Sequence, residues 1–169
     1  CLIDIGGGTT DVAVYSEGSI KHTSVLGLGG AHVSNDIAVG LRTPFEEAER
    51  VKKKFGVAAA RFLGSDDVIS VPSVGGRRPR EVSRKLLCEI IEPRVDEILS
   101  LARQSLVKEG LEDKIPSGVV LTGGCSAPPN YCPTDFTLRK QMAVFVLKSK
   151  EGAAYTPPAA VGIFTDVPA

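Results

Sequence analysis

The sequence predicts an α/β fold, because segments with strand periodicity and segments with helical periodicity both occur along the chain. Short apolar runs with strand-like alternation occur near the N-terminus and again near residue 120. Between them, longer stretches repeat their apolar residues at helical spacing. Glycine clusters interrupt the pattern where strands are expected to end. These clusters are Gly6-Gly7-Gly8, Gly29-Gly30 and Gly123-Gly124.

Composition limits the classes of function. The 169 residues, 43% of them hydrophobic, suffice for one domain or two small ones. Twenty basic residues balance twenty acidic ones, which argues against binding of nucleic acid or an anionic membrane through net charge. We expect no transmembrane helix and no signal peptide. The four cysteines lack zinc-site spacing, so we expect free thiols: Cys1, Cys88, Cys125 and Cys132.

The first forty residues predict a meander followed by a helix. Residues 2–5, 11–15 and 20–26 are expected to form three strands, and residues 16–19 a turn. The chain starts inside the first of these strands without an initiator Met, which suggests a fragment. After Gly29-Gly30 a short helix is expected, because apolar residues recur at four-residue steps: Val33, Ile37 and Leu41.

A second helix is expected from residue 44 to about residue 55. Thr43 is predicted to cap it, Pro44 suits the first helical position, and Glu46 would complete a capping box. Gly56 would end the helix. A strand over residues 68–71 and a loop over residues 75–78 follow.

A long helical stretch is expected over residues 80–109, with Gly110 as its end. Pro93 lacks an amide hydrogen, so we expect a kink there or two abutting helices. Residues 118–122 read as a buried strand that leads to Gly123-Gly124. The apolar positions that carry the helical prediction are Val82, Leu86, Ile90, Ile98, Ala102 and Leu106.

The first glycine cluster suggests an anion-binding loop. A plain hairpin needs one or two glycines, whereas three in a row also allow backbone amides to approach an anion closely. Thr9 and Thr10 add hydroxyl donors, and Asp4 could hold a hydrated magnesium ion. A plain hairpin remains the alternative for this cluster by itself. The other two clusters favour a nucleotide cleft over three unrelated turns, since one precedes a helix and one follows a buried strand.

Two motifs resemble the superfamily of actin, sugar kinases and heat-shock chaperones. "DIGGGTTDVAVY" is similar to its second phosphate-binding motif, and "VVLTGGCS" is similar to its adenosine motif. The resemblance implies the second half of an actin-like, ribonuclease-H-like ATPase fold, which has a mixed sheet with flanking helices and a small α+β subdomain. It also implies ATP and Mg²⁺ as ligands. In "AERVKKKFG", Glu49, Lys52 and Lys53 match the spacing of adenosine-contacting residues in the chaperones. An ordinary surface pair is the alternative for Glu49 and Lys53. The implied nucleotide-binding residues are Asp4, Gly6, Gly7, Gly8, Thr9, Thr10, Gly29, Gly30, Glu49, Lys52, Lys53, Gly123, Gly124 and Cys125.

Within this superfamily the chain resembles the FtsA family of bacterial cell-division proteins. "LRTPFEEAERVKKKFG", "SVGGRRPREVSRKLLCEIIEPRVDEIL" and "IPSGVVLTGG" carry the resemblance. It implies one subdomain of residues 1–42 and 111–169 and a smaller one of residues 43–110. It further implies ATP binding, at most slow hydrolysis, filament formation, contacts with other division proteins, and tethering of FtsZ at the cytoplasmic face of the inner membrane. We identify no catalytic residue and expect this chain alone to be inactive.

A basic loop is a candidate partner site. Through the resemblance, Arg77, Arg78 and Arg80 would receive the C-terminal peptide of FtsZ, whereas the alternative is a solvated loop. We expect the family's N-terminal half to be absent from this chain, and the resemblance ends near residue 127. We therefore expect residues 128–169 to be atypical, through a reading-frame error or an incomplete gene, and the family's membrane-binding helix to be absent. A PilM-type pilus-assembly ATPase and a sugar or acetate kinase are the rival functions.

Overall fold

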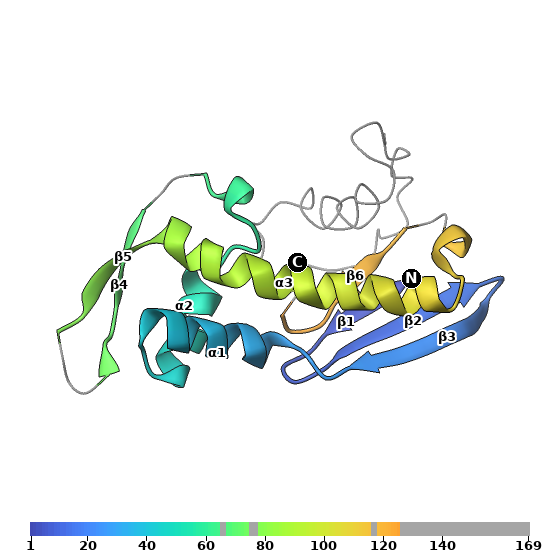
Figure 1. Cartoon of the computed structure of the whole chain (residues 1–169), viewed down its shortest axis with the longest axis horizontal. Coiled ribbons are helices and arrows are strands. Elements are labelled where there is room, and N and C mark those ends of the chain that lie inside the picture. The colour runs from blue at the N-terminus through green and yellow to red at the C-terminus, as the bar shows by residue number, and fades with distance from the viewer. Residues whose placement is uncertain (65–66, 75–77, 116–117, 126–169) are drawn as a thin grey trace, which may run out of the picture.

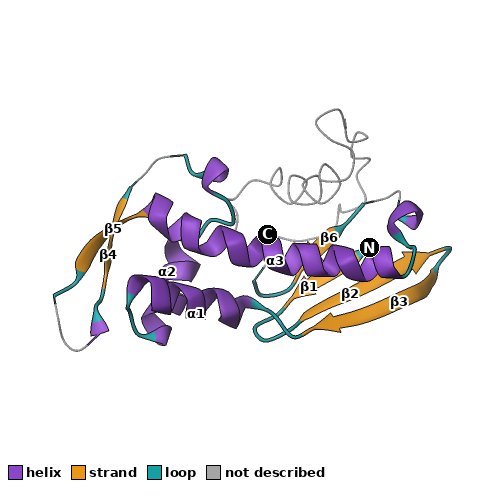
Figure 2. Ribbon diagram, in the orientation of Figure 1, coloured by secondary structure: helices purple, strands orange, loops and turns teal. Residues whose placement is uncertain are grey.

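The structure, a computed structural model, describes residues 1–64, 67–74, 78–115 and 118–125. Figure 1 shows one long helix, α3 (Arg84–Lys108), running along the molecule. A β-sheet packs under one half of this helix, two shorter helices pack under the other half, and a β-ribbon lies beyond the end at which the helix begins. Groups of strands are followed by groups of helices along the described part of the chain, in keeping with the predicted α/β class (Figure 2).

The sheet has four strands in the order β3-β2-β1-β6. Strands β1 (Leu2–Ile5), β2 (Thr10–Ser16) and β3 (Ser19–Leu26) form the expected antiparallel meander. Strand β6 (Val120–Thr122) pairs with β1 in parallel, so the sheet is mixed, as predicted. Parallel pairing of distant segments places the end of β6 beside the end of β1, where two of the glycine clusters lie.

One hydrophobic core lies between the sheet and the second half of α3. Alternate residues of β1 and β2 point to the same face and are buried there, as strand periodicity dictates. The helix contributes every third or fourth residue. The core is made of Ile3, Ile5, Val12, Val14, Ile98, Ala102, Leu106, Leu111 and Val119.

A second core joins the first half of α3 to α1 (Gly30–Leu41), α2 (Phe45–Phe55) and the ribbon of β4 (Val68–Val71) and β5 (Arg80–Ser83). The expected stripe of α1 is buried in this core. The subdomain boundaries at residues 42 and 111 stay a prediction, because α3 contributes to both cores. Buried members of the second core include Val33, Ile37, Leu41, Ala48, Val51, Ile69, Val71, Val82, Leu87, Ile91, Val95 and Leu99.

The start of α2 differs from the prediction. Pro44 is the N-cap residue, and no side chain caps the helix, so the predicted capping box of Thr43 and Glu46 is wrong. Thr43 is buried, and its hydroxyl donates instead to the carbonyl of Pro72 at 2.6 Å. Because the Thr43 hydroxyl is bonded to the segment after β4, it does not cap the amides at the start of α2.

The start of α3 also differs from the prediction. Residues 80–83 form β5 rather than a helical turn, and the Ser83 hydroxyl accepts the Leu86 amide to cap the helix. The predicted apolar face is therefore displaced at this end: Leu86 is 46% exposed, whereas Leu87 is fully buried. The expected alternatives at Pro93 were a kink or two abutting helices, and the second is wrong because one helix continues through Pro93. Pro93 is exposed, which leaves the carbonyl that lacks its amide partner on the solvent side.

The last strand is shorter and less buried than predicted, because β6 begins at Val120 and that residue is 49% exposed. Other local predictions are confirmed within the described residues. Gly56 follows α2, and Gly110, with a positive φ of 63°, follows α3. Cys1, Cys88 and Cys125 are free thiols, and Cys132 lies outside the described residues. None of the helices described here has the length and apolar character needed to cross a membrane.

Candidate functional site

The glycine loop between β1 and β2 is held by the first turn of α1. The Gly6 amide donates to the Thr9 carbonyl at 2.9 Å, which closes the loop. The Gly30 amide donates to the Gly6 carbonyl at 2.9 Å, and the Ala31 amide donates to the Gly7 carbonyl at 2.7 Å. The start of this helix, where backbone donors otherwise lack partners, is therefore occupied by the loop itself.

The same contacts determine where the loop amides point. A trans peptide unit places its C=O and N–H in opposite directions. Because the carbonyls of Gly6 and Gly7 face α1, the amides of Gly7 and Gly8 point away from it. Both residues are exposed, and their amides have no hydrogen-bond partner among the described residues. Two adjacent amides directed outward can bind an anion.

Neither the backbone conformation nor the packing of the described residues requires glycine at positions 7 and 8. Both have φ outside the left-handed region, and an added Cβ would meet no described atom within 4 Å. Gly29 is different, because a Cβ there would lie 2.7 Å from the Gly6 carbonyl oxygen and 2.8 Å from the Gly7 carbonyl oxygen. Gly29 therefore permits the close approach of α1, whereas Gly7 and Gly8 leave open space.

The threonines after the triplet differ in their surroundings. Thr10 is completely buried, and its hydroxyl donates to the Leu28 carbonyl at 2.8 Å. Thr9 is exposed, and its hydroxyl donates to Asp11 at 3.4 Å. The Thr10 hydroxyl therefore stabilises the fold, whereas the Thr9 hydroxyl lies at the surface.

The loop after β6 packs against the base of the glycine loop. Gly123 has a φ of +97°, and an added Cβ would collide with the Ile5 carbonyl and the Asp4 carboxylate. The Cys125 amide donates to the Ile5 carbonyl at 3.1 Å, and its thiol lies where a Gly30 side chain would be. Burial raises the pKa of the Cys125 thiol, so it stays protonated at neutral pH.

Three residues of α1 and α2 form a hydrogen-bonded group beside Gly30. The Lys52 ammonium donates to the Gly30 carbonyl at 2.9 Å and the Ser34 hydroxyl at 2.7 Å, and it pairs with Glu49 at 2.7 Å. Ser34 also donates to the Glu49 carboxylate. The Lys52 side chain is 4% exposed, whereas that of Lys53, 3.2 Å from Glu49, is 60% exposed. The Lys52 ammonium therefore has all three of its hydrogens directed at protein acceptors.

The group keeps Glu49 ionised. Desolvation of this partly buried carboxylate raises its pKa, but hydrogen bonds from Lys52 and Ser34 outweigh that effect and lower the pKa to about 2. Glu49 thus presents a permanent negative charge at neutral pH. One of its oxygens is held by Lys52 and Ser34, and the other is shared with the exposed Lys53.

Most residues of the predicted nucleotide site lie in this one region. The glycine loop, the start of α1, the loop after β6 and the group around Lys52 are joined by the contacts above. Sequence reasoning missed Ser34, because a serine one turn into a helix resembles any polar helix residue. It also missed His32, whose Nδ1 accepts the Gly29 amide at 3.1 Å.

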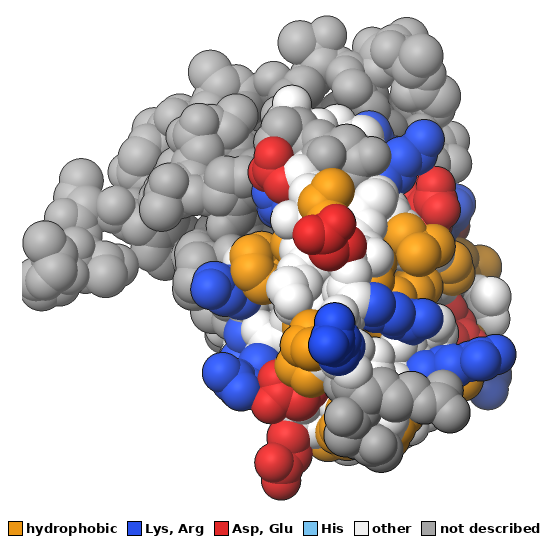
Figure 3. Space-filling view, turned by 90° about the vertical axis from the view of Figure 1, so that its left-hand side faces the viewer, with side chains coloured by type: hydrophobic (Ala, Val, Ile, Leu, Met, Phe, Trp, Pro, Cys, Tyr) orange, Lys and Arg blue, Asp and Glu red, His pale blue; other side chains and the backbone are white. Residues whose placement is uncertain are grey.

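Arg78 and Arg80 lie apart from this region, Arg78 just before β5 and Arg80 at its first residue. Arg78 and Arg80 are exposed, and Arg80 donates to the Leu41 carbonyl. Arg77 lies outside the described residues. Figure 3 views the end of the molecule that carries β4 and β5, where basic, acidic and hydrophobic side chains are interspersed.

Comparison with known proteins identifies the family. The family model for cell division protein FtsA matches residues 1–157. The chain is 52% identical over 126 residues to cell division protein FtsA of Pseudomonas aeruginosa, which covers 75% of this chain and 30% of that protein. It is 41% identical over 133 residues to FtsA of Escherichia coli K12, which covers 75% of this chain and 32% of that protein. The family match extends past residue 127, where the quoted resemblance ends.

Solved structures identify the fold. MreB5 of Spiroplasma citri bound to ADP is 26% identical, with a TM-score of 0.59 over 73% of this chain and 41% of that chain. A MamK double helical filament is 16% identical, with a TM-score of 0.60 over 86% of this chain and 46% of that chain. The chain spans about 30% of the length of the curated relatives named above. It belongs to the FtsA family of cell-division proteins and has the α/β fold of the actin-like ATPases.

Proposed function

We propose that this chain is part of an ATP-binding division protein that assembles into filaments at the division site and tethers FtsZ to the cytoplasmic membrane. Family membership supports the division role and favours it over the pilus-assembly and kinase alternatives. Because the chain spans about 30% of its relatives, these activities are proposed for the whole protein to which the segment corresponds.

The observation that carries the nucleotide proposal is the direction of the Gly7 and Gly8 amides. Two outward amides without partners in the described residues, on glycines that the fold does not require, suit the close approach of a phosphate. A hairpin turn alone would not need either glycine at these positions. MreB5, which has the same fold at 26% identity, is bound to ADP, and this supports a nucleotide as the ligand.

Asp4 fits a magnesium site. Mg²⁺ keeps several waters and takes one or two carboxylates, and Asp4 is a half-exposed carboxylate at the end of β1. Its register partner Asp11 lies directly opposite on β2, on the same face of the sheet. Magnesium bound there through water would neutralise phosphate charge, and Asp4 would orient the water that bridges them.

The nucleoside would lie between α2 and the loop after β6. Glu49 is ionised and partly exposed, so it can accept hydrogen bonds from ribose hydroxyls. The exposed Lys53 would flank the base, and Gly124, where an added Cβ would meet no described atom within 4 Å, would allow its approach. Lys52 is buried and would not contact the ligand.

A substitution in the loop tests the nucleotide site. Gly7→Val places a branched side chain in the open space beside the outward amides, so binding of Mg-ATP should be lost. Gly64→Val is the matched control, because Gly64 also has open space and ordinary φ but lies outside the site. Isothermal titration of the full chain with Mg-ATP measures both variants. Equal affinity of the wild type and Gly7→Val would show that the loop is only a turn.

A further inference from the structure

Lys52 is connected to the glycine loop through two peptide units. Its ammonium donates to the Gly30 carbonyl at 2.9 Å. The amide of that same peptide unit, which belongs to Ala31, donates to the Gly7 carbonyl at 2.7 Å. The amide of the Gly7 peptide unit belongs to Gly8 and points outward, as derived above. A continuous series of hydrogen bonds thus leads from a buried cation to an exposed amide.

From this series, and on the basis of the nucleotide function proposed above, we propose that Lys52 is a positioning residue for the phosphate-binding loop. It holds the Gly30–Ala31 peptide in place and polarises it, and that peptide holds the Gly7–Gly8 peptide. Lys52 would thereby act on the phosphate end of the nucleotide, although its place in the sequence is beside residues expected at the nucleoside.

Electrostatics supports this role. A hydrogen bond to a charged donor is roughly twice as strong as one between neutral groups, and successive bonds in a chain polarise one another. A cation at the Gly30 carbonyl makes the Ala31 amide a better donor to Gly7. The Gly8 amide then becomes a better donor to an anion. Because the Lys52 side chain is 4% exposed, water screens its charge little.

Ser34 and Glu49 keep the ammonium in this position. The Ser34 hydroxyl lies within donor distance of both the Gly30 carbonyl, at 3.1 Å, and the Glu49 carboxylate. Because the Gly30 carbonyl already accepts from Lys52, we assign the single hydroxyl hydrogen of Ser34 to the charged Glu49 carboxylate. Ser34 then accepts from Lys52 at 2.7 Å. The ammonium is fixed by three acceptors at once, which directs one of its hydrogens at Gly30.

The first test uses the full 169-residue chain without ligand. In Lys52→Met the Gly30 carbonyl loses its charged donor, so hydrogen exchange of the Ala31 amide should accelerate at least about tenfold by the loss of a buried charge-assisted bond. Lys53→Met is the matched control, since it removes an exposed lysine from the neighbouring position, and Ala31 exchange should stay unchanged. Equal exchange in the two variants would overturn the proposal.

The second test measures affinity for Mg-tripolyphosphate, a probe with phosphates and no nucleoside. Lys52→Met should weaken its binding about tenfold, whereas Lys53→Met should leave it unchanged and weaken only ADP. If Lys52→Met instead weakened only ADP and left tripolyphosphate binding unchanged, Lys52 would be a nucleoside contact and the positioning role would be refuted. If the wild type binds neither Mg-tripolyphosphate nor ADP, the proposed nucleotide-binding function is wrong. Hydrogen exchange of the Ala31 amide then still decides whether Lys52 positions the loop.

A further variant covers the case in which Lys52→Met does not fold because Glu49 is left unpaired. Replacing both partners, in Lys52→Met/Glu49→Leu, removes the charges together, which is often tolerated in proteins. This variant should show the same rapid Ala31 exchange and the same weak tripolyphosphate binding. Wild-type values for both measurements in the folded double variant would overturn the proposal.

Discussion

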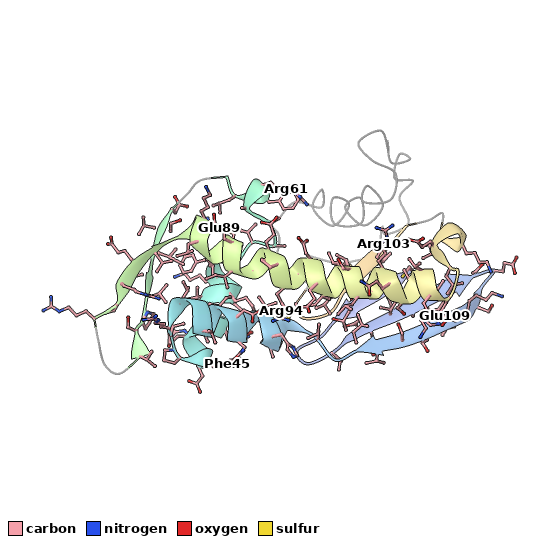
Figure 4. The ribbon with its side chains drawn as sticks, in the orientation of Figure 1. Phe45, Arg61, Glu89, Arg94, Arg103 and Glu109 are labelled. Atoms are coloured by element: carbon pink, nitrogen blue, oxygen red, sulfur yellow. The ribbon has the colours of Figure 1, made fainter. Side chains whose placement is uncertain are left out.

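Arg94 of α3 binds Asp36 of α1 through two parallel contacts. Its Nε lies 2.6 Å from one carboxylate oxygen of Asp36, and its Nη2 lies 3.1 Å from the other. Arg94 lies near the middle of α3 on the side that faces α1 (Figure 4). Since the first turn of α1 holds the glycine loop, this pair connects the long helix to the candidate site.

Substitution of Arg94 by lysine should weaken this connection. Lysine keeps the charge but cannot make the two-point contact, so the free energy of unfolding should fall by about 1 kcal/mol. Arg50→Lys is the control, because Arg50 is 76% exposed in its pair with Glu47 and its loss should change stability by less than about 0.5 kcal/mol. Urea unfolding of both variants measures the difference. Equal losses would show that the two-point geometry contributes nothing.

A methyl group at Gly29 should separate α1 from the glycine loop. The added Cβ would meet only backbone atoms: the Gly6 and Gly7 carbonyl oxygens and the Thr9 nitrogen, at 2.7 to 2.9 Å. We expect Gly29→Ala to lower the free energy of unfolding by about 2 kcal/mol, in the range of overpacked sites, and to weaken Mg-ATP binding. In Gly27→Ala, where an added Cβ meets no described atom within 4 Å, both quantities should stay as in the wild type. A stable Gly29→Ala variant with unchanged ATP affinity would contradict this account.

Stability should fall in acid because of Glu49. Its pKa is lowered from 4.5 to about 2 in the folded chain, so the folded state binds the proton more weakly than the unfolded state. The resulting stabilisation is complete above pH 4.5 and is lost as the pH falls toward 2. With allowance for the partial exposure of Glu49, this stabilisation contributes about 2 kcal/mol to the free energy of unfolding.

Comparison of Glu49→Gln with the wild type isolates the contribution of Glu49 to the free energy of unfolding. The stability gap between wild type and variant, measured by urea unfolding, should be largest near pH 6 and should narrow below pH 4.5. Other acidic groups affect both proteins equally, so only the gap reports on Glu49. A gap that is constant from pH 6 to pH 3 would refute the ion-pair account.

The sequence predicted most elements, and the misses have a physical cause. Strand alternation in β1 and β2 and the four-residue repeat of α1 are local patterns, and they were correct. Thr43 was misassigned because its hydroxyl bonds to Pro72, which is distant in the sequence. Leu86 was wrongly predicted to be buried, because residues 80–83 pair with β4 as strand β5 and the helix begins only at Arg84. Both errors arise where tertiary contacts outweigh local propensity.

The sequence predicted which residues lie together in the candidate region better than it predicted the contacts of each residue. The first glycine cluster indicated where backbone amides are open, but the amides of Gly29 and Gly30 have partners within the chain. No local pattern shows that Gly29 packs on the loop while Gly7 stays open. Lys52 and Lys53 are adjacent in sequence, and only the helix geometry of α2 makes one buried and the other exposed. Ser34 gave no signal because its partner Glu49 lies on another helix.

Arg77, Arg78 and Arg80 are the candidate site for the FtsZ peptide. Arg80 is a poor choice for mutation, since it donates to the Leu41 carbonyl and its loss would affect the fold. Arg78 is exposed, and Arg77 lies next to it in sequence. We therefore predict the effect of Arg77→Glu/Arg78→Glu.

Charge reversal at these two positions should weaken binding of the FtsZ C-terminal peptide by several-fold to about thirtyfold, since each exposed contact contributes about 0.2–1 kcal/mol. The difference should shrink at high salt, because exposed charges are screened. Fluorescence anisotropy of the labelled peptide measures both effects. Lys21→Glu/Lys108→Glu is the control, because it makes the same change in net charge at exposed residues of β3 and the end of α3. If the two double variants bind equally, net charge alone governs the affinity and the loop is only a solvated surface.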